Sequence, residues 1–432
     1  MPYDSFLLDP LLLFVTGLCA SWIIAHRPLH HRPWALKITV AVTLVIYWGT
    51  SVSLYFDLEW TRWLWEMCGA QTGRDWMLNS GLFHFEFRQP GWLTHLLSVL
   101  IFMTYPLWLA LGLALGMPRL RDGLEAGPPR WRGRRSRQEV WYGTATDART
   151  GDGLWLHAET VAPPDAPAYA HGWAAFFPAT GAPVLSRFGP HPHAPRQPSP
   201  PWLATNGATI EVGQWQGQTP RIHWNLQQKI LTPPLLPFPR WLWEMELLPA
   251  AMLVLDPQAH WAGQLTVDGA DVPFAGQAGV ARIYGHGSAA RWAWLHADLG
   301  DSAVLEVVSA VSLRPGLNRL RPMAFVRLRC DGVDWPRFPL LAALTAFRCE
   351  PALPRWTLDG TVGNLRLHVE VTLPPERCVA VDYRDPDGRT AVCTNSARAD
   401  ATVVLEEQRG GAWTVKHRWE LAGRAHAEVG IR

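Results

Sequence analysis

Residues 366–372 read Arg-Leu-His-Val-Glu-Val-Thr, and this heptad alternates apolar with polar side chains. Its apolar members share one face of an extended chain, because successive side chains of a strand point to opposite sides. The same period of two recurs at 221–227 and at 413–420. Many short strands of this kind, broken by Gly, Pro and Asp, are typical of a β-sandwich or barrel. We therefore predict an all-β fold from about residue 138 onward.

The N-terminal part has a different composition, with three apolar stretches at 6–25, 35–56 and 92–116. Each is long enough to cross a bilayer, because a hydrocarbon core of about 30 Å requires about 20 apolar residues in a helix. The chain begins Met-Pro-Tyr-Asp, which lacks the positive charge of a cleaved signal peptide. We expect three retained transmembrane helices. The Trp-rich loop at 57–91 is expected either as an interfacial helix or as a packed cap over the spans.

Arginines follow the third stretch directly, within 119–137. They are Arg119, Arg121, Arg130, Arg132, Arg134, Arg135 and Arg137. Positive charge next to a span favours the cytoplasmic side. This pattern predicts a multi-pass protein of the inner (cytoplasmic) membrane, with a cytoplasmic C-terminal part and the bilayer as a partner.

Composition argues against several other classes of protein. The net charge of +2 is too small to indicate a nucleic-acid partner. The six Cys residues form no CxxC pair and no zinc-type spacing, so we expect free thiols and neither a metal nor a cofactor. The oligomeric state is not indicated.

Two further segments carry a family resemblance. The first runs from Glu139-Val-Trp-Tyr-Gly143 to Gly153-Leu-Trp-Leu-His-Ala-Glu159, and the second is 279–297, which ends in a Trp-x-Trp strand. They resemble a superfamily of tandem lipocalin-like barrels that includes carotenoid 1,2-hydratases, tocopherol cyclases and several fungal Diels–Alderases. The resemblance covers about 138–432, and residues 393–395 and 423–428 are similar to its closing strands.

The resemblance implies two lipocalin-like barrels or curved sheets in tandem, at 138–275 and 276–432. They would follow a membrane domain at 1–118 and a basic linker at 119–137. It also implies a membrane-anchored enzyme that hydrates, cyclises or isomerises a long apolar isoprenoid-type substrate after protonating it. Residues 281–283 depart from the hydratases, because they hold no carboxylate where those enzymes place an acid.

Such chemistry requires an acid in a dry pocket and aromatic faces that stabilise a carbocation. The candidate acids lie in or just after the segment 279–297: His286, His296, Asp298 and Tyr284. The candidate substrate-binding residues are Trp241, Trp243, Trp292, Trp294, Trp173 and His171. Positions 241 and 243, like 292 and 294, would share one face of a strand. Plain core packing is an equally valid interpretation of these Trp residues.

Two other functions fit the same sequence. A lipocalin-like barrel requires only a cavity to act as a non-catalytic lipid or isoprenoid carrier. The membrane spans would also suit an assembly factor of a membrane complex. A buried acid beside the aromatic lining would favour the enzyme over both.

Overall fold

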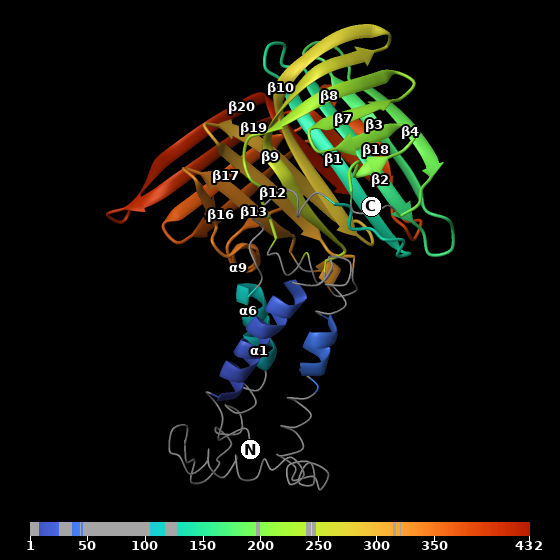
Figure 1. Ribbon diagram of the computed structural model, residues 1–432. Coiled ribbons are helices and arrows are strands. Elements are labelled where there is room, and N and C mark those ends of the chain that lie inside the picture. The colour runs from blue at the N-terminus through green and yellow to red at the C-terminus, as the bar shows by residue number, and fades with distance from the viewer. Residues whose placement is uncertain are drawn as a thin grey trace, which may run out of the picture. The chain divides into compact units, whose positions relative to one another are not determined.

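The computed structural model describes residues 8–25, 37–43, 45, 104–116, 128–195, 199–238, 243, 248–313, 317–319 and 321–432. The chain divides into two compact units, Met1–Arg119 and Leu120–Arg432 (Figure 1). The first contains helices and the second is mostly β, so the change of composition near residue 120 coincides with a change of fold class.

In the first unit, α1 (Leu8–Ala25) packs against α6 (Tyr105–Gly116). A Cβ placed on Gly17 would lie 2.5 Å from the carbonyl oxygen of Leu109, so the two backbones are in direct contact there. Small residues permit this close approach. Among the described residues, no helix combines the length and the hydropathy that are needed to cross a membrane. Most of the expected span at 35–56, and the whole loop at 57–91, lie outside the described residues.

The second unit contains two ten-stranded antiparallel sheets. The strands of the first sheet are β1 (Arg137–Asp147), β2 (Gly153–Ala162), β3 (Tyr169–Phe177), β4 (Val184–Pro192), β5 (Leu203–Ala204), β6 (Ala208–Glu211), β7 (Gln214–Gln218), β8 (Ile222–Ile230), β9 (Ala250–Val267) and β10 (Ala270–Gly285). Those of the second are β11 (Arg291–Gly300), β12 (Ala303–Val311), β13 (Met323–Cys330), β14 (Val333–Trp335), β15 (Arg348–Cys349), β16 (Arg355–Val362), β17 (Leu365–Thr372), β18 (Val379–Arg384), β19 (Thr390–Arg409) and β20 (Ala412–Ile431).

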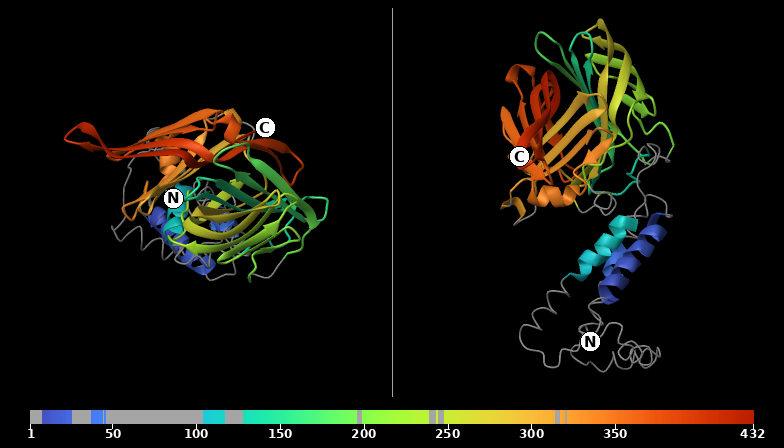
Figure 2. Two further views of the ribbon diagram at one scale, coloured as in Figure 1. Left: turned by 90° about the horizontal axis from the view of Figure 1, so that it is seen from above. Right: turned by 90° about the vertical axis from the view of Figure 1, so that its left-hand side faces the viewer.

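The two sheets share the order of six adjacent strands. The first has the order β4-β3-β2-β1-β10-β9-β8-β7-β6-β5. The second has the order β14-β13-β12-β11-β20-β19-β17-β16-β15, with β18 paired separately to β19. The stretch β4-β3-β2-β1-β10-β9 of the first path therefore recurs ten places later as β14-β13-β12-β11-β20-β19, and the first sheet curls into a half-barrel (Figure 2). The expected mostly β C-terminal part with two sheets in tandem is confirmed, and the first of the two sheets is curled. The last strand of the first sheet, β10, ends at Gly285.

The alternating segments form strands as expected. In β17 the side chains of Leu367, Val369 and Val371 are fully buried. Burial of an aliphatic side chain of this size stabilises the fold by about 1.5–3 kcal/mol. The segment 413–420 is also a strand, but Val415 is 59% exposed. The reason is that β19 and β20 form a long hairpin whose tip projects beyond the sheet (Figure 1).

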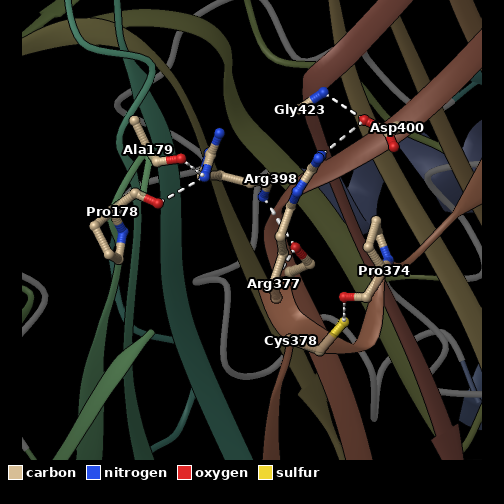
Figure 3. A network of polar contacts seen from close by, with 9 residues as sticks. Pro178, Ala179, Pro374, Arg377, Cys378, Arg398, Asp400 and Gly423 are labelled. Carbon is tan, nitrogen blue, oxygen red and sulfur yellow. Dashed lines mark hydrogen bonds and ion pairs between the residues drawn. The ribbon is translucent and has the colours of Figure 1, made fainter. Parts of the chain in front are cut away.

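Arg398 on β19 joins the two sheets. Its Nη1 donates to the carbonyl oxygens of Pro178 at 2.6 Å and Ala179 at 2.9 Å, directly after β3 (Figure 3). Beside it, Asp400 accepts from Arg377 Nη1 at 3.1 Å and from the Gly423 N–H at 2.6 Å. These bonds fix the irregular part of the β19–β20 pair, where the register shifts between residues 396 and 401.

Short helical segments complete the second unit: η2 (Leu317–Arg319), α9 (Pro339–Thr345) and η3 (Pro375–Arg377). One local expectation is wrong. Trp243 has a helical backbone, not the extended one expected of a strand that includes positions 241 and 243, and Trp241 lies outside the described residues. The prolines within 233–239 precede Trp243 and disfavour a paired strand there.

Candidate active site

A cavity of about 200 Å³ lies between the two sheets. Most of its wall is aliphatic or aromatic. The lining residues that matter for chemistry are Tyr142 from β1, Trp292 and Trp294 from β11, Tyr383 from β18 and Glu428 from β20. The rest includes Val140, Met252, Ile283, Val308, Met323 and Phe325. The cavity therefore offers an apolar, aromatic surface with one carboxyl group.

Strand register explains why these residues meet. Trp294 on β11 stands directly opposite Glu428 on β20, and Glu428 stands opposite Asn395 on β19. Residues directly opposite in an antiparallel pair project from the same face. Gly430 stands opposite Trp292, and a Cβ at this glycine would clash with the indole ring. Gly430 thus allows Trp292 to lie over β20 beside the carboxyl group.

Glu428 is held by three neighbours. Trp292 Nε1 donates to Oε1 at 2.8 Å, and Asn395 Nδ2 donates to Oε2 at 3.2 Å. The Cys393 thiol is hydrogen-bonded both to Glu428 and to Tyr383. Burial raises the pKa of the Glu428 carboxyl, and these hydrogen bonds offset only part of that rise. A carboxyl group with a raised pKa retains its proton to higher pH, which is the requirement for a general acid.

Two buried tyrosines border the carboxyl group. The Tyr142 hydroxyl donates to the sulfur of Met252 at 2.9 Å, and its ring meets Trp294 edge-on with centroids 5.4 Å apart. Tyr383 meets Trp292 edge-on at 5.9 Å. The pKa of each hydroxyl is raised well above its ordinary value, first by burial and then by nearby carboxylates. Both hydroxyls therefore stay protonated, and the two rings line the cavity.

An ion pair occupies the next row of the second sheet. His296 Nδ1 and Glu306 Oε1 are 2.5 Å apart, and both side chains are almost fully buried. Burial alone would lower the pKa of His296, but the Glu306 carboxylate outweighs it and raises the pKa. His426 stands opposite His296, and burial and the positive His296 lower its pKa well below the ordinary value. Glu306 also accepts from Trp294 Nε1 at 3.2 Å, so the pair anchors one cavity wall.

A second buried group lies on β2 and β3 of the first sheet. Glu159 Oε2 is 3.2 Å from His157 Nε2, and Glu159 Oε1 is 2.5 Å from His171 Nε2. The two histidines outweigh burial and lower the pKa of Glu159 to about 2. His157 stacks on Trp173 at 3.8 Å, and the Tyr383 ring meets Trp173 edge-on at 5.4 Å. Tyr383 therefore separates this group from the cavity.

The structure gathers some of the residues that were expected from the sequence. Trp292 and Trp294 line the cavity, and His296 stacks beside Trp294 with ring centroids 6.4 Å apart. Asp298 lies farther along β11, where Oδ1 accepts from Gln258 Nε2 at 2.8 Å and closes a turn. His286 follows β10, outside the cavity lining.

The remaining expected residues lie elsewhere. Tyr284 points to the other face of β10, because its neighbour Ile283 lines the cavity. There Tyr284 lies under the guanidinium of Arg130, which also covers Trp243 at 4.8 Å. Trp173 and His171 belong to the Glu159 group. Trp241 lies outside the described residues.

Sequence reasoning missed Glu428, Tyr142 and Tyr383. Two local signals were present. Tyr142 belongs to the first quoted motif, and His426-Ala-Glu428 repeats the period of two seen in Trp292-Ala-Trp294-Leu-His296. Each of these two sequence patterns places polar or aromatic side chains on a single face of a strand. Neither pattern shows which face of the strand is turned toward the cavity.

One group of potential metal ligands occurs away from the cavity. Ligand atoms of Cys330, Asp331 and His417 lie within 4.8 Å of one another. Lys416 Nζ is 3.4 Å from Asp331, so a lysine already serves as the counter-ion of that carboxylate. Burial and the charge of Asp331 raise the pKa of the Cys330 thiol, which does not favour a thiolate ligand.

Comparison with known proteins gives three results. Residues 241–431 match the model of the family described as tocopherol cyclase-like. The chain is 46% identical over 308 residues to the uncharacterized protein Rv0493c of Mycobacterium tuberculosis, and to its counterpart in strain CDC 1551, covering 71% of this chain and 90% of the relative. A solved structure of a protein assigned as an AttH, from Nitrosomonas europaea, covers 68% of this chain and 92% of that one, with 16% identity and a TM-score of 0.43.

Proposed function

Because the chain belongs to the family of the mycobacterial protein Rv0493c, and its C-terminal part matches the tocopherol cyclase-like model, we propose that it is a membrane-anchored enzyme acting on a long apolar isoprenoid. The reaction is a hydration, cyclisation or isomerisation that begins with protonation of an alkene. The observation that carries this proposal is the position of Glu428: a carboxyl group with a raised pKa in an aromatic cavity.

The chemistry follows from the groups in the cavity. The Glu428 carboxyl transfers its proton to one alkene carbon, and the neighbouring carbon becomes a cation. The faces of Trp292, Trp294 and Tyr383 stabilise that cation by cation–π attraction. In a cyclisation or isomerisation, a nucleophile or a neighbouring C–H bond of the substrate supplies the electrons. The released proton returns to the Glu428 carboxylate. In a hydration, water adds to the cation and gives its proton to the same carboxylate.

The size and polarity of the cavity support an apolar substrate that is only partly enclosed. Pockets that hold a drug-sized ligand have volumes of about 300–1,000 Å³. A cavity of about 200 Å³ fits the reactive end of a long isoprenoid, and the remaining chain would extend outward. A bound end held beside Glu428 reacts in one conformation, which lowers the entropic part of the barrier.

Membrane anchoring is part of the proposal. The apolar stretches at 6–25, 35–56 and 92–116 and the arginines of 119–137 support it, with the β unit on the cytoplasmic side. The contact between α1 and α6 at Gly17 is of the kind found between membrane helices. Leu11 and Val15 of α1, and Leu107 and Leu111 of α6, are exposed apolar side chains that would suit a lipid environment. An anchor would keep the enzyme where an isoprenoid dissolves.

Deuterium incorporation tests the function directly. We expect the full-length protein in D₂O to convert an acyclic carotenoid or a prenylated quinol to a product with at least one deuterium on carbon. Mass spectrometry of the extracted product gives the measurement, and a heat-treated sample is the control. Tight binding of these isoprenoids without conversion or labelling would contradict an enzyme and support a carrier.

Substrate binding is expected to depend on the two tryptophans of β11. Replacing Trp292 and Trp294 together by Ala removes two aromatic walls of the cavity. Each wall contributes about 0.5–1.5 kcal/mol beyond its buried area. We therefore expect at least tenfold weaker binding of a long isoprenoid in a direct titration. The control is Trp413→Ala, a change on the projecting part of β20; equal affinity in a folded double variant would contradict the cavity assignment.

A further inference from the structure

The first sheet encloses a second cavity, also of about 200 Å³, inside its half-barrel. It is separate from the cavity between the sheets, because Trp141 lines the inner one while its neighbours Val140 and Tyr142 line the other. Three indoles form much of its wall: Trp141, Trp202 and Trp215. The mouth is apolar, since Val212 is 51% exposed and Ile230 is 45% exposed.

The carboxylate of Asp256, on β9, lines this cavity, and the residue is only 7% exposed. Its Oδ2 accepts from Gln228 Nε2 at 2.6 Å, and Gln228 Oε1 in turn accepts from Trp261 Nε1 at 3.0 Å. The tryptophan therefore fixes the amide so that it donates to Asp256. Among the described residues, no lysine, arginine or histidine forms an ion pair with Asp256.

An unpaired carboxylate in an apolar cavity is costly, so its presence calls for a compensating charge. Burial raises the pKa of Asp256 to about 6, which leaves the group negative at neutral pH and above. Glu211 at the rim is the other ionisable residue in the described lining, and it adds a second negative charge. Indole faces attract cations as well. The Arg282 guanidinium already lies over the Trp141 ring, 5.0 Å from its centroid. The two carboxylates and the indoles of Trp202 and Trp215 thus favour a positive ligand.

We propose that this inner cavity is a binding site for an organic ammonium ion, either a quaternary amine or a protonated alkylamine. The positive nitrogen lies beside Asp256, and its methyl or methylene groups contact Trp141, Trp202 and Trp215. The apolar mouth at Val212 and Ile230 admits an alkyl substituent. This site is independent of the reaction at Glu428, since the two cavities lie on opposite faces of β1.

Paired ligands test the charge requirement on the unchanged protein. Choline and its neutral carbon isostere 3,3-dimethylbutan-1-ol have the same shape, and isothermal titration of the full-length protein at pH 8 measures both affinities. We expect saturable choline binding and at least tenfold weaker binding of the neutral alcohol. Absence of choline binding, or equal affinities, would overturn the proposal.

The pH dependence of choline binding and two variants test whether the ligand binds beside Asp256. Choline is charged at every pH, so a change in its Kd reports the protein. With a pKa of about 6, Asp256 is almost fully ionised at pH 8 and about one-tenth ionised at pH 5, which predicts about tenfold weaker binding at pH 5. Asp256→Asn should weaken choline binding at pH 8 at least tenfold and abolish the pH effect. Glu211→Gln should change the choline affinity at pH 8 less than threefold. Unchanged affinity in folded Asp256→Asn would place the ligand elsewhere.

Discussion

Replacing Glu428 by Gln is expected to lower the rate of deuterium incorporation into the isoprenoid product by about 10²–10⁴-fold, the usual contribution of a general acid. The amide retains the shape of the side chain, and its single oxygen can still accept from Trp292 while its NH2 group faces Asn395, whose own amide can turn to accept. The strands around it should therefore stay in register. The amide has no acidic proton to give to an alkene. The wild-type rate should also fall as the pH rises through the raised pKa of Glu428, because only the protonated form reacts.

Asp298→Asn is the matched control for this variant. Asp298 is the carboxylate that the sequence favoured, but it closes a turn with Gln258 and Gly300 and does not line the cavity. We expect its variant to keep at least half of the activity. The opposite result, full activity in Glu428→Gln and loss in Asp298→Asn, would show that the acid lies at the end of β11.

The fold could be predicted to a large extent because a strand with one buried face has an alternating apolar and polar sequence. The alternation of Leu367, Val369 and Val371 identifies a strand without knowledge of its neighbours, and all three are fully buried. The same alternation did not predict burial at 413–420, where the hairpin of β19 and β20 projects beyond the other strands. Whether a strand end is covered depends on the length of distant strands, which no local pattern reveals.

The site was predicted only in part, because it is built from strand pairing over long distances. Trp292-x-Trp294 is a local pattern and indicated an aromatic wall. The carboxyl group beside it comes from β20, more than 130 residues later, through the pairing of Trp294 with Glu428. Tyr284 shows the converse difficulty: it follows Ile283 directly, and a step of one residue turned it to the other face of β10.

Breaking the pair of His296 and Glu306 is expected to have the largest effect on stability. Glu306→Gln should lower the free energy of unfolding by about 3–5 kcal/mol, because it leaves a buried histidine without the carboxylate that raises its pKa. A raised histidine pKa stabilises the fold below the unfolded pKa of about 6.5, and this stability is lost as the pH rises through the folded pKa. The loss in the variant should therefore be largest near pH 5–6 and smaller near pH 9, as measured by urea denaturation at each pH.

Two further variants separate the ion pair from general packing. Substituting both His296 and Glu306 by Leu removes both charges together, and we expect it to recover most of the stability lost in Glu306→Gln, because no buried charge remains unpaired. Arg221→Ala breaks the exposed pair with Asp268 and should shift the denaturation midpoint far less. If Glu306→Gln loses the same stability at pH 5 and at pH 9, then His296 is neutral in the folded protein and Glu306 serves only to accept the hydrogen bonds of His296 and Trp294.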